Sequence, residues 1–236
     1  MHESAGNGRI SAVLSRAWRR IWPALRFQVC CRTAPLIGLW VLLVLYPNPF
    51  NIPVSFYRMF NPDIDPVAVD PLLDGLPSDP ADIEREVLRL IPYGYDWQTQ
   101  GMPWNFPSTR SIVERRQGDC KARAVVLASI LERLDIPYRI NSSFVHVWVE
   151  YENKAETVFE NPRAKFYQQD PSTGRRLFQF PEIQWRLWFD STVEGLWTVM
   201  PLFRKLLLLF GIAFIVLARV VLRRNPSWSI DNVMST

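Results

Sequence analysis

The sequence has very little of the two side chains that most often perform nucleophilic chemistry together: two histidines and three cysteines among 236 residues. Cys30 and Cys31 precede the first hydrophobic run, so Cys120 is the only thiol in the middle of the chain. A disulfide within that middle region is therefore excluded, and a cysteine left over there is either a small buried side chain or a reactive thiol. Because His2 lies at the N-terminus, His146 is the histidine available to Cys120.

Internal repeats and low-complexity tracts are also missing, and the middle of the chain has no net positive charge. Residues 1–50 carry six basic and one acidic side chain, residues 51–203 carry 16 basic and 21 acidic, and residues 204–236 carry five basic and one acidic. A nucleic-acid-binding protein concentrates positive charge on its folded body, so we expect no nucleic-acid partner. Basic ends beside hydrophobic runs are typical of a membrane protein.

Two hydrophobic runs are present, and they differ in strength. Residues 206–222 are apolar except for Arg219 and approach the shortest length of a spanning helix. Residues 34–46 are fewer, and by length alone they could form a buried helix or a signal peptide. Arginines precede this run and no small-residue cleavage site follows it, which favours an uncleaved anchor. We predict transmembrane helices at residues 33–50 and 204–222.

These two helices predict a topology. Residues 1–32 form either a basic amphipathic helix on the membrane surface or a basic tail, and the positive-inside rule places them in the cytoplasm together with the tail 223–236. The chain is then a two-pass protein of the plasma or inner membrane, with an extracytoplasmic middle. Arg204 and Lys205 fall on the outer side and argue mildly against this topology. Tryptophans in residues 183–203 predict an interfacial helix.

Between the hydrophobic runs we expect a stalk and a domain. Residues 51–80 are rich in proline and aspartate, which predicts an extended stalk. The domain then covers residues 81–182. Its first helix begins at Pro80, with Asp79 as the N-cap, and ends before Pro92.

The centre of that domain predicts a helix followed by strands. Apolar residues recur at helical spacing after Cys120 and stop before Pro137. Residues 138–151 alternate between apolar and polar side chains, which predicts a strand that carries His146, and residues 157–162 predict a second strand. The predicted fold class is α+β, with an antiparallel hairpin.

The order of Cys120, His146 and Asn161 indicates nucleophilic chemistry. A helix N-terminus favours negative charge and should lower the pKa of the Cys120 thiol. A histidine within reach can stabilise the thiolate and later protonate the leaving group, and an amide or carboxylate can orient the imidazole. Asn161 or the alternative Glu160 could do so, but not both, because adjacent strand residues point to opposite faces. Taken singly, His146 could equally be an ordinary strand histidine and Asn161 a turn residue.

Three runs resemble the transglutaminase-like superfamily in their order and spacing: Gly118-Asp119-Cys120, Ile136-Pro137-Tyr138-Arg139 and His146-Val147-Trp148-Val149-Glu150. Asn161 before Pro162 fills the place of the family's usual aspartate. The resemblance covers roughly residues 81–162. Two departures from the family pattern stand out: Asn161 removes a negative charge beside His146, and Lys-Ala-Arg follows Cys120 where bacterial members commonly have acidic residues.

The resemblance implies a papain-like core, in which the helix that begins with the cysteine packs on an antiparallel sheet, and a catalytic triad of Cys120, His146 and Asn161. It implies acyl transfer from a peptide or protein amide through a thioester, without a cofactor or metal. The backbone N–H of Cys120 is one candidate oxyanion donor, and Trp97, Gln98 and Trp104 are further oxyanion or substrate candidates.

The sequence therefore predicts a membrane-anchored cysteine enzyme, either a peptidase or amidase or an acyltransferase. Hydrolysis is favoured because water is always present, whereas selection of an amine requires a dedicated site. The alternative is a catalytically inactive transglutaminase-like module that binds a partner at the membrane. A structural membrane component with an incidental resemblance is the remaining possibility, and the combined motif argues against it.

Overall fold

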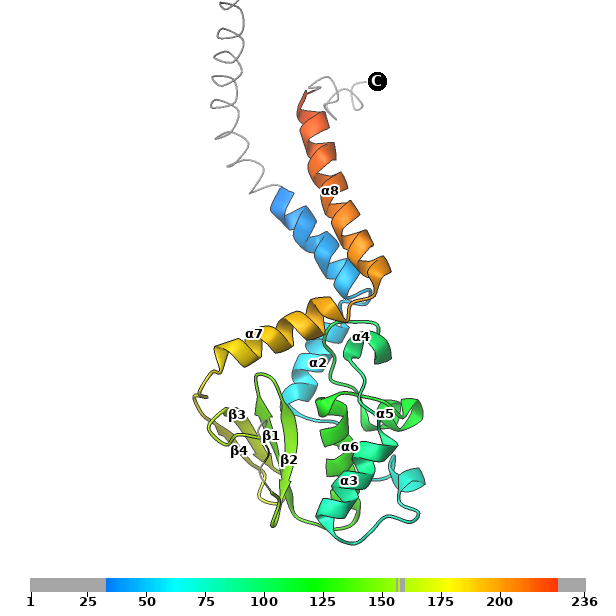
Figure 1. The fold of residues 1–236 in the computed structure, drawn as a ribbon, viewed down its shortest axis with the longest axis vertical. Helices are drawn as coiled ribbons and strands as arrows, with labels where there is room; N and C mark the ends of the chain where they lie inside the picture. Colours follow the sequence, from blue (N-terminus) through cyan, green and yellow to red (C-terminus); the bar gives the residue numbers. More distant parts are fainter. Residues whose placement is uncertain (1–32, 156, 158–159, 225–236) are drawn as a thin grey trace, which may run out of the picture. The chain divides into compact units, whose positions relative to one another are not determined.

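Figure 1 shows the computed structural model, which describes residues 33–155, 157 and 160–224. The chain divides into two compact units, and residues 46–201 form the larger one. The described part of the other unit consists of the helix Thr33–Leu45 and α8 (Leu202–Arg224). The predicted amphipathic segment 1–32 and most of the predicted tail lie outside the described residues.

Helix α6 (Cys120–Arg133) is the centre of the larger unit, and most of its side chains are buried. The carboxylate of Asp119 caps its N-terminus by accepting hydrogen bonds from the N–H groups of Lys121 and Ala122. The other helical elements of this unit are α2 (Asn51–Phe60), η1 (Asp70–Leu72), α3 (Pro80–Leu90), α4 (Asp96–Thr99), α5 (Thr109–Arg115), α7 (Trp185–Val193) and η2 (Glu194–Thr198).

A four-stranded antiparallel sheet packs against α6, in the order β2-β1-β3-β4. Its strands are β1 (Tyr138–Ser143), β2 (Val147–Tyr151), β3 (Lys165–Asp170) and β4 (Arg175–Phe178). Helices α3 and α6 lie on the same side of the sheet in Figure 1. The fully buried Val125, Ile130 and Val149 belong to the core between α6 and β2. The α+β class and the antiparallel sheet are thus confirmed.

The first predicted helix of the domain is confirmed. Helix α3 begins at Pro80, and the carboxylate of Asp79 accepts hydrogen bonds from the N–H groups of Ala81 at 3.1 Å and Asp82 at 3.3 Å. The helix ends at Leu90, shortly before Pro92. Local capping chemistry alone was sufficient to locate both ends.

The prediction of one strand over residues 138–151 is wrong, because a tight turn at Phe144 and Val145 divides it into β1 and β2. The hydroxyl of Ser143 accepts hydrogen bonds from the N–H groups of Val145 and His146, and His146 O accepts one from Ser143 N at 2.8 Å. The turn itself contains no glycine, proline or asparagine, and the serine that precedes it is a weaker turn former than these residues.

The second predicted strand is also displaced. Thr157, Glu160 and Asn161 lie outside any strand, and residues 162–164 form a turn in which Ala164 N donates to Asn161 O at 3.0 Å. The strand that pairs with β1 on its other side is β3, which starts after this turn. An Asn-Pro pair favours a turn, in agreement with the turn at residues 162–164, and residues 158 and 159 lie outside the described residues.

The prediction of an extended stalk at residues 51–80 is wrong as well. This segment contains α2 and η1, and Val69 and Leu72 are buried in the core. Asp65 N donates to the hydroxyl of Ser129 on α6 at 3.2 Å, which ties the segment to the central helix. Prolines and aspartates divide the segment into short pieces, but burial of its scattered apolar side chains still stabilises the folded chain.

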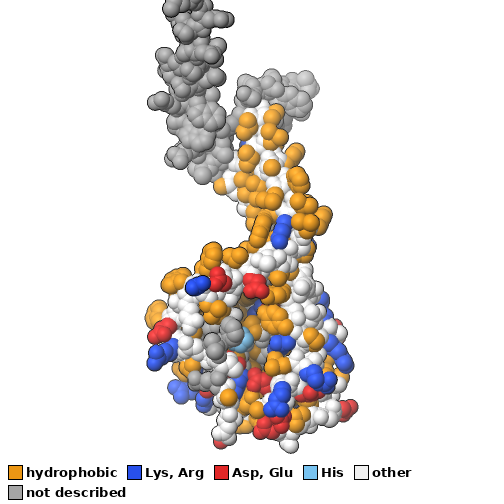
Figure 2. Space-filling view, viewed as in Figure 1, with side chains coloured by type: hydrophobic (Ala, Val, Ile, Leu, Met, Phe, Trp, Pro, Cys, Tyr) orange, Lys and Arg blue, Asp and Glu red, His pale blue; other side chains and the backbone are white. Residues whose placement is uncertain are grey.

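In the smaller unit, the helix Thr33–Leu45 and α8 approach each other closely. A Cβ atom at Gly211 would lie 2.1 Å from the indole of Trp40, so the glycine permits the contact. The guanidinium of Arg204 donates to Val44 O at 2.6 Å. Hydrophobic side chains cover much of α8 in Figure 2.

Within the described ranges, none of the helices taken singly has both the length and the apolarity required to cross a membrane. Only Trp185–Thr198 and Leu202–Val221, joined through a bend, meet that requirement as a pair. The two predicted spanning helices therefore stay predictions.

Candidate active site

Cys120 is the first residue of α6, and the chain reaches it through a tightly packed approach. A Cβ atom at Gly118 would lie 2.3 Å from the Cβ of Ala122, so a glycine is required where this segment passes over the helix. Gly94 N donates to Gly118 O at 3.0 Å, and Gly118 N donates to Pro92 O at 3.2 Å. These bonds hold the approach to α6 against the segment that follows α3.

The sulfur of Cys120 faces the start of β2. The backbone N–H groups of Val147 and Lys121 act on it as hydrogen-bond donors, which favours the thiolate. Val147 directly follows His146, so the thiol lies one peptide unit from the histidine backbone. The sequence separates the two residues widely, and the packing of α6 on β2 brings them together.

The pKa of the Cys120 thiol is raised to about 11, which contradicts the expectation that the helix terminus lowers it. Burial is the largest cause, because a charge is less stable away from water, and the Asp119 carboxylate adds repulsion. The ammonium of Lys121 and the two backbone N–H groups act in the opposite direction but are weaker. The residue that caps α6 therefore opposes the effect of the helix N-terminus on its neighbour.

His146 occupies the last position of the hairpin turn, immediately before β2. Its ring stacks with that of Trp148, with 6.0 Å between centroids and 12° between planes. Its pKa is lowered to about 4, first by burial and then by the positive charge of Lys154, while Asp119 and Glu84 act in the opposite direction. The imidazole is therefore neutral at neutral pH.

These two pKa values describe a pair that is uncharged at rest. At pH 7 Cys120 is a thiol and His146 a neutral imidazole, whereas a preformed ion pair would need a thiolate and an imidazolium. A neutral imidazole can accept a proton, so in this state His146 is suited to act as a general base. Deprotonation of the thiol would then accompany its attack on a substrate.

Asn161 and Glu160, the two candidates for orienting the imidazole, each have another hydrogen-bond partner in the structure. Asn161 Oδ1 accepts a hydrogen bond from Arg163 N at 2.9 Å, within the turn before β3. The carboxylate of Glu160 is buried and accepts a hydrogen bond from Lys154 Nζ at 2.9 Å. The described contacts therefore give both candidates structural partners other than His146.

The predicted oxyanion and substrate candidates have structural partners too. The indole N–H of the buried Trp97 donates to Leu196 O at 3.2 Å. Gln98 Oε1 accepts a hydrogen bond from Tyr95 N at 3.2 Å and caps α4. Trp104 packs against the core, and its carbonyl accepts a hydrogen bond from Tyr46. Of the predicted donors, the Cys120 N–H is at the site by its position in the chain.

Two buried lysines near the site were not predicted. Lys121 contacts the carboxylates of Asp96 and Asp119, while Lys154 contacts those of Glu84 and Glu160. Lysine and acidic residues are usually exposed, so sequence alone gave little reason to bury them. The one available signal was the position of Lys121 in an otherwise apolar helical run.

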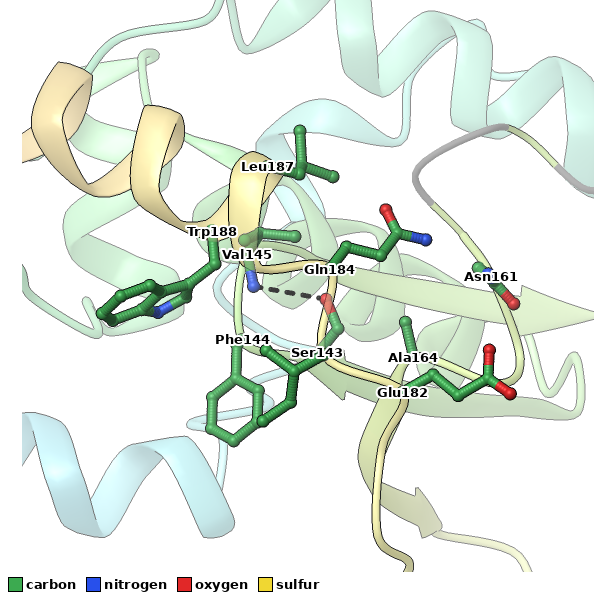
Figure 3. Close-up of a pocket in the computed structure, with 10 residues that line it drawn as sticks. Ser143, Phe144, Val145, Asn161, Ala164, Glu182, Gln184, Leu187 and Trp188 are labelled. Atoms are coloured by element: carbon green, nitrogen blue, oxygen red, sulfur yellow. Dashed lines mark hydrogen bonds between the residues drawn. The ribbon is translucent and has the colours of Figure 1, made fainter.

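A groove adjoins the site beside the hairpin turn (Figure 3). Phe144 and Val145 line it from the turn, Leu187 and Trp188 from α7, and Asn161 from the loop before β3. The groove is therefore mainly apolar and begins one residue from His146. Nowhere among the described residues do three histidine, cysteine, aspartate or glutamate side chains gather as metal ligands.

Comparison with known proteins finds no family model, no curated protein and no solved structure that matches this chain.

Proposed function

We propose that this chain is a membrane-anchored cysteine enzyme of transglutaminase-like type, which cleaves or transfers acyl groups of peptide or protein amides through a thioester on Cys120. The observation that carries the proposal is the position of the thiol: it starts α6 and lies against the backbone N–H of Val147, next to His146. A cysteine helix on an antiparallel sheet is also what the proposed papain-like core requires. Proteins of that type join a thiol and an imidazole from two separate elements.

The uncharged pair defines the order of steps. His146 accepts the thiol proton as the Cys120 sulfur attacks the amide carbonyl, and the resulting oxyanion is stabilised by backbone N–H groups, that of Cys120 among them. The imidazolium then gives its proton to the amine as the carbon–nitrogen bond breaks, which leaves a thioester. Water or a second amine attacks the thioester, loses a proton to His146 and releases the acyl group, while the thiol regains its proton.

Exposed aromatic side chains support the membrane part of the proposal. Trp185 on α7 and Tyr57 on α2 are 67% and 65% exposed, and Phe189 and Phe56 beside them are exposed as well. Large exposed apolar surfaces mark sites of protein or membrane contact, and tryptophan and tyrosine favour the membrane interface. In the chain, α2 follows the apolar helix Thr33–Leu45 and α7 precedes α8. The proposed topology keeps two passes, cytoplasmic termini and an extracytoplasmic larger unit.

One observation favours the second candidate function, a catalytically inactive binding module. Asn161 accepts a hydrogen bond from Arg163 N and Glu160 accepts one from Lys154, so each candidate third member also serves the local structure. Ser-His-Asp enzymes lose rate when their aspartate is replaced by asparagine, and this chain has Asn161 where the resemblance expects an aspartate. The two functions differ in one measurable property, which is dependence of Cys120 chemistry on His146.

Acylation of the full-length chain in lipid nanodiscs separates the two. The chain is treated with p-nitrophenyl acetate near pH 7, and acetylation of each cysteine is followed by peptide mass spectrometry. Cys30 and Cys31 serve as reference thiols within the same molecule. The enzyme proposal expects His146→Ala to slow acetylation of Cys120 by about 100-fold or more, the usual contribution of a general base, without affecting the reference thiols. Equal rates in both proteins would leave the binding module as the better account.

A further inference from the structure

Lys121 is an unusual neighbour for a nucleophile, because its ammonium group is buried between two carboxylates. Lys121 Nζ lies 3.0 Å from Asp96 Oδ2 and is paired with Asp119 Oδ2, and its side chain is only 11% exposed. A buried charge is costly unless it is paired, so this arrangement is stable only while all three groups keep their partners.

The same groups form a chain of contacts from α4 to the first turn of α6. Asp96, on α4, also accepts a hydrogen bond from Asn105 N at 2.9 Å. Asp119 Oδ1 accepts hydrogen bonds from Lys121 N at 3.0 Å and Ala122 N at 3.3 Å, while its other oxygen faces Lys121 Nζ. The Asp119 carboxylate therefore fixes the first turn of α6, which carries Cys120, and Lys121 in turn fixes that carboxylate.

We propose that Lys121 is a positioning residue, which Asp96 holds in place, which fixes Asp119 beside Cys120, and which offsets part of the negative charge that Asp119 directs at the thiol. In this arrangement Asp119 favours the thiol and Lys121 favours the thiolate, while Asp96 holds the Lys121 ammonium from its other side. The proposal rests on the proposed function only for its catalytic consequence. The charge effect itself is measurable on Cys120 without any substrate.

Other titratable groups lie near this cluster and the thiol. The Cys120 thiol also faces Tyr93 and Arg123, whose guanidinium lies over the Tyr93 ring at 5.2 Å, and His146 precedes the Val147 N–H that the sulfur accepts. Tyr46 is close enough to Asp96 to sense its charge. Tyr93 stays neutral near pH 7 because burial raises the pKa of its phenol, so it does not change the sign of the cluster's effect.

The test is the pH dependence of Cys120 alkylation by iodoacetamide, read by peptide mass spectrometry on the full-length chain in nanodiscs. Alkylation requires the thiolate, so the midpoint of the rate reports the thiol pKa. Asp119→Asn should shift the midpoint to lower pH and speed alkylation at pH 8 by roughly three- to tenfold, as expected for removal of a nearby negative charge. Asparagine keeps the N-cap in this variant. Lys121→Met should shift the midpoint to higher pH and slow alkylation.

The opposite signs distinguish charge from mere packing. If Lys121 only supports the fold, both substitutions loosen the site and speed alkylation, and a faster Lys121→Met protein overturns the proposal. Arg133→Met is the matched control on the same helix, since its partner Asp70 is distant from the thiol and the pair is exposed. Lys121→Arg should restore the wild-type midpoint. If Lys121→Met does not fold, Lys121→Gln takes its place, and a midpoint there that is unshifted or shifted to lower pH overturns the proposal.

The result is separable from that of the acetylation experiment. Charge-ordered shifts in alkylation together with acetylation that ignores His146 would support the role of Lys121 and reject the enzyme. Acetylation that depends on His146 together with unshifted midpoints would support the enzyme and reject this role of Lys121.

Discussion

Two buried lysines, Lys121 and Lys154, hold comparable positions on either side of the candidate pair. Lys121 joins two carboxylates beside Cys120, and Lys154 joins Glu84 at 2.7 Å and Glu160 at 2.9 Å on the side of His146. Each cluster contains two carboxylates and one ammonium. The two clusters nevertheless act on Cys120 and His146 through charges of opposite sign.

In the first cluster the charge that acts most on the thiol is the carboxylate of Asp119, which favours the neutral thiol. In the second cluster the charge that acts most on the imidazole is the ammonium of Lys154, which favours the neutral imidazole. Burial raises the pKa of the thiol and lowers that of the imidazole, so it favours the neutral form of both groups, and it is the largest cause in each case. The two clusters therefore favour one state, an uncharged Cys120–His146 pair.

The ammonium of Lys154 makes three hydrogen bonds, whereas the ammonium of Lys121 makes two. Lys154 Nζ donates to Val149 O at 2.8 Å in addition to its two carboxylates, and Tyr151 donates to Glu84 at 2.5 Å. The second cluster links α3, β2 and the loop before β3. Removal of either ammonium should therefore disturb the fold, and removal of the one in the first cluster should also change the chemistry of Cys120.

The largest expected effect is on stability. Lys154→Met leaves the carboxylates of Glu84 and Glu160 facing each other without a cation, and loss of one member of a buried ion pair costs about 3–5 kcal/mol. Denaturant unfolding of the full-length chain in nanodiscs measures this free energy. Arg133→Met, which breaks the exposed pair with Asp70, should cost less than about 1 kcal/mol. Equal losses in the two proteins would show that the Lys154 cluster is not a structural link.

The next effect is a pH dependence set by His146. Its pKa is about 4 in the folded chain and near 6.5 when unfolded, so the unfolded chain binds more protons between those values. Stability from the neutral imidazole is present above about pH 6.5 and is lost as the pH falls toward 4, by about 2 kcal/mol after allowance for partial exposure. His146→Gln should therefore gain stability relative to wild type from pH 7 to pH 4. A constant difference between the two unfolding free energies would contradict the lowered pKa.

Asp96 titrates in the same range with the opposite sign, because its pKa is raised to about 6, chiefly by burial. The folded chain takes up this proton before the unfolded chain does, so Asp96 favours folding as the pH falls from about 7 to 4. Each single variant is therefore compared with wild type at every pH, since the two effects partly cancel in the wild-type curve.

The smallest expected effect concerns the predicted third member of the triad. Asn161→Ala should change His146-dependent acetylation of Cys120 by less than about threefold. The side-chain oxygen Asn161 Oδ1 accepts a hydrogen bond from Arg163 N within the turn, and substitutions of surface turn residues usually change stability little. Glu160→Gln, measured in parallel, should lower the free energy of unfolding, because Lys154 loses a carboxylate partner, and should change the acetylation rate little. A loss of 100-fold or more in Asn161→Ala would restore Asn161 as the orienting group.

The sequence was sufficient to locate features with local causes. Asp79 and Pro80 start α3 because capping depends on adjacent residues, and Cys120 starts α6 beside its own cap, Asp119. The α+β class followed from the change in hydrophobic period between α6 and the strands. Cys120 and His146 could be chosen from the sequence as a candidate pair because no other thiol or imidazole lies in the middle of the chain.

Features that depend on distant parts of the chain were not predictable. The turn at Phe144 is set by the hydroxyl of Ser143 and not by a turn sequence, and burial of Val69 depends on a core formed by much later residues. The direction of the Cys120 pKa shift required knowledge of how closely Asp119 and the surrounding atoms enclose the sulfur. Burial and a neighbouring carboxylate can together outweigh the effect of a helix N-terminus on the pKa of a thiol.

The central claim is that the Cys120–His146 pair is uncharged at rest, and an NMR titration of His146 tests it most directly. The chain has only two histidines, so His2→Ala leaves a single imidazole to observe after ¹³C/¹⁵N-histidine labelling of the full-length protein in nanodiscs. The account predicts a neutral ring at pH 7 that takes up a proton only near pH 4. An imidazolium at pH 7 that becomes neutral in Cys120→Ala would show a preformed ion pair and contradict the account.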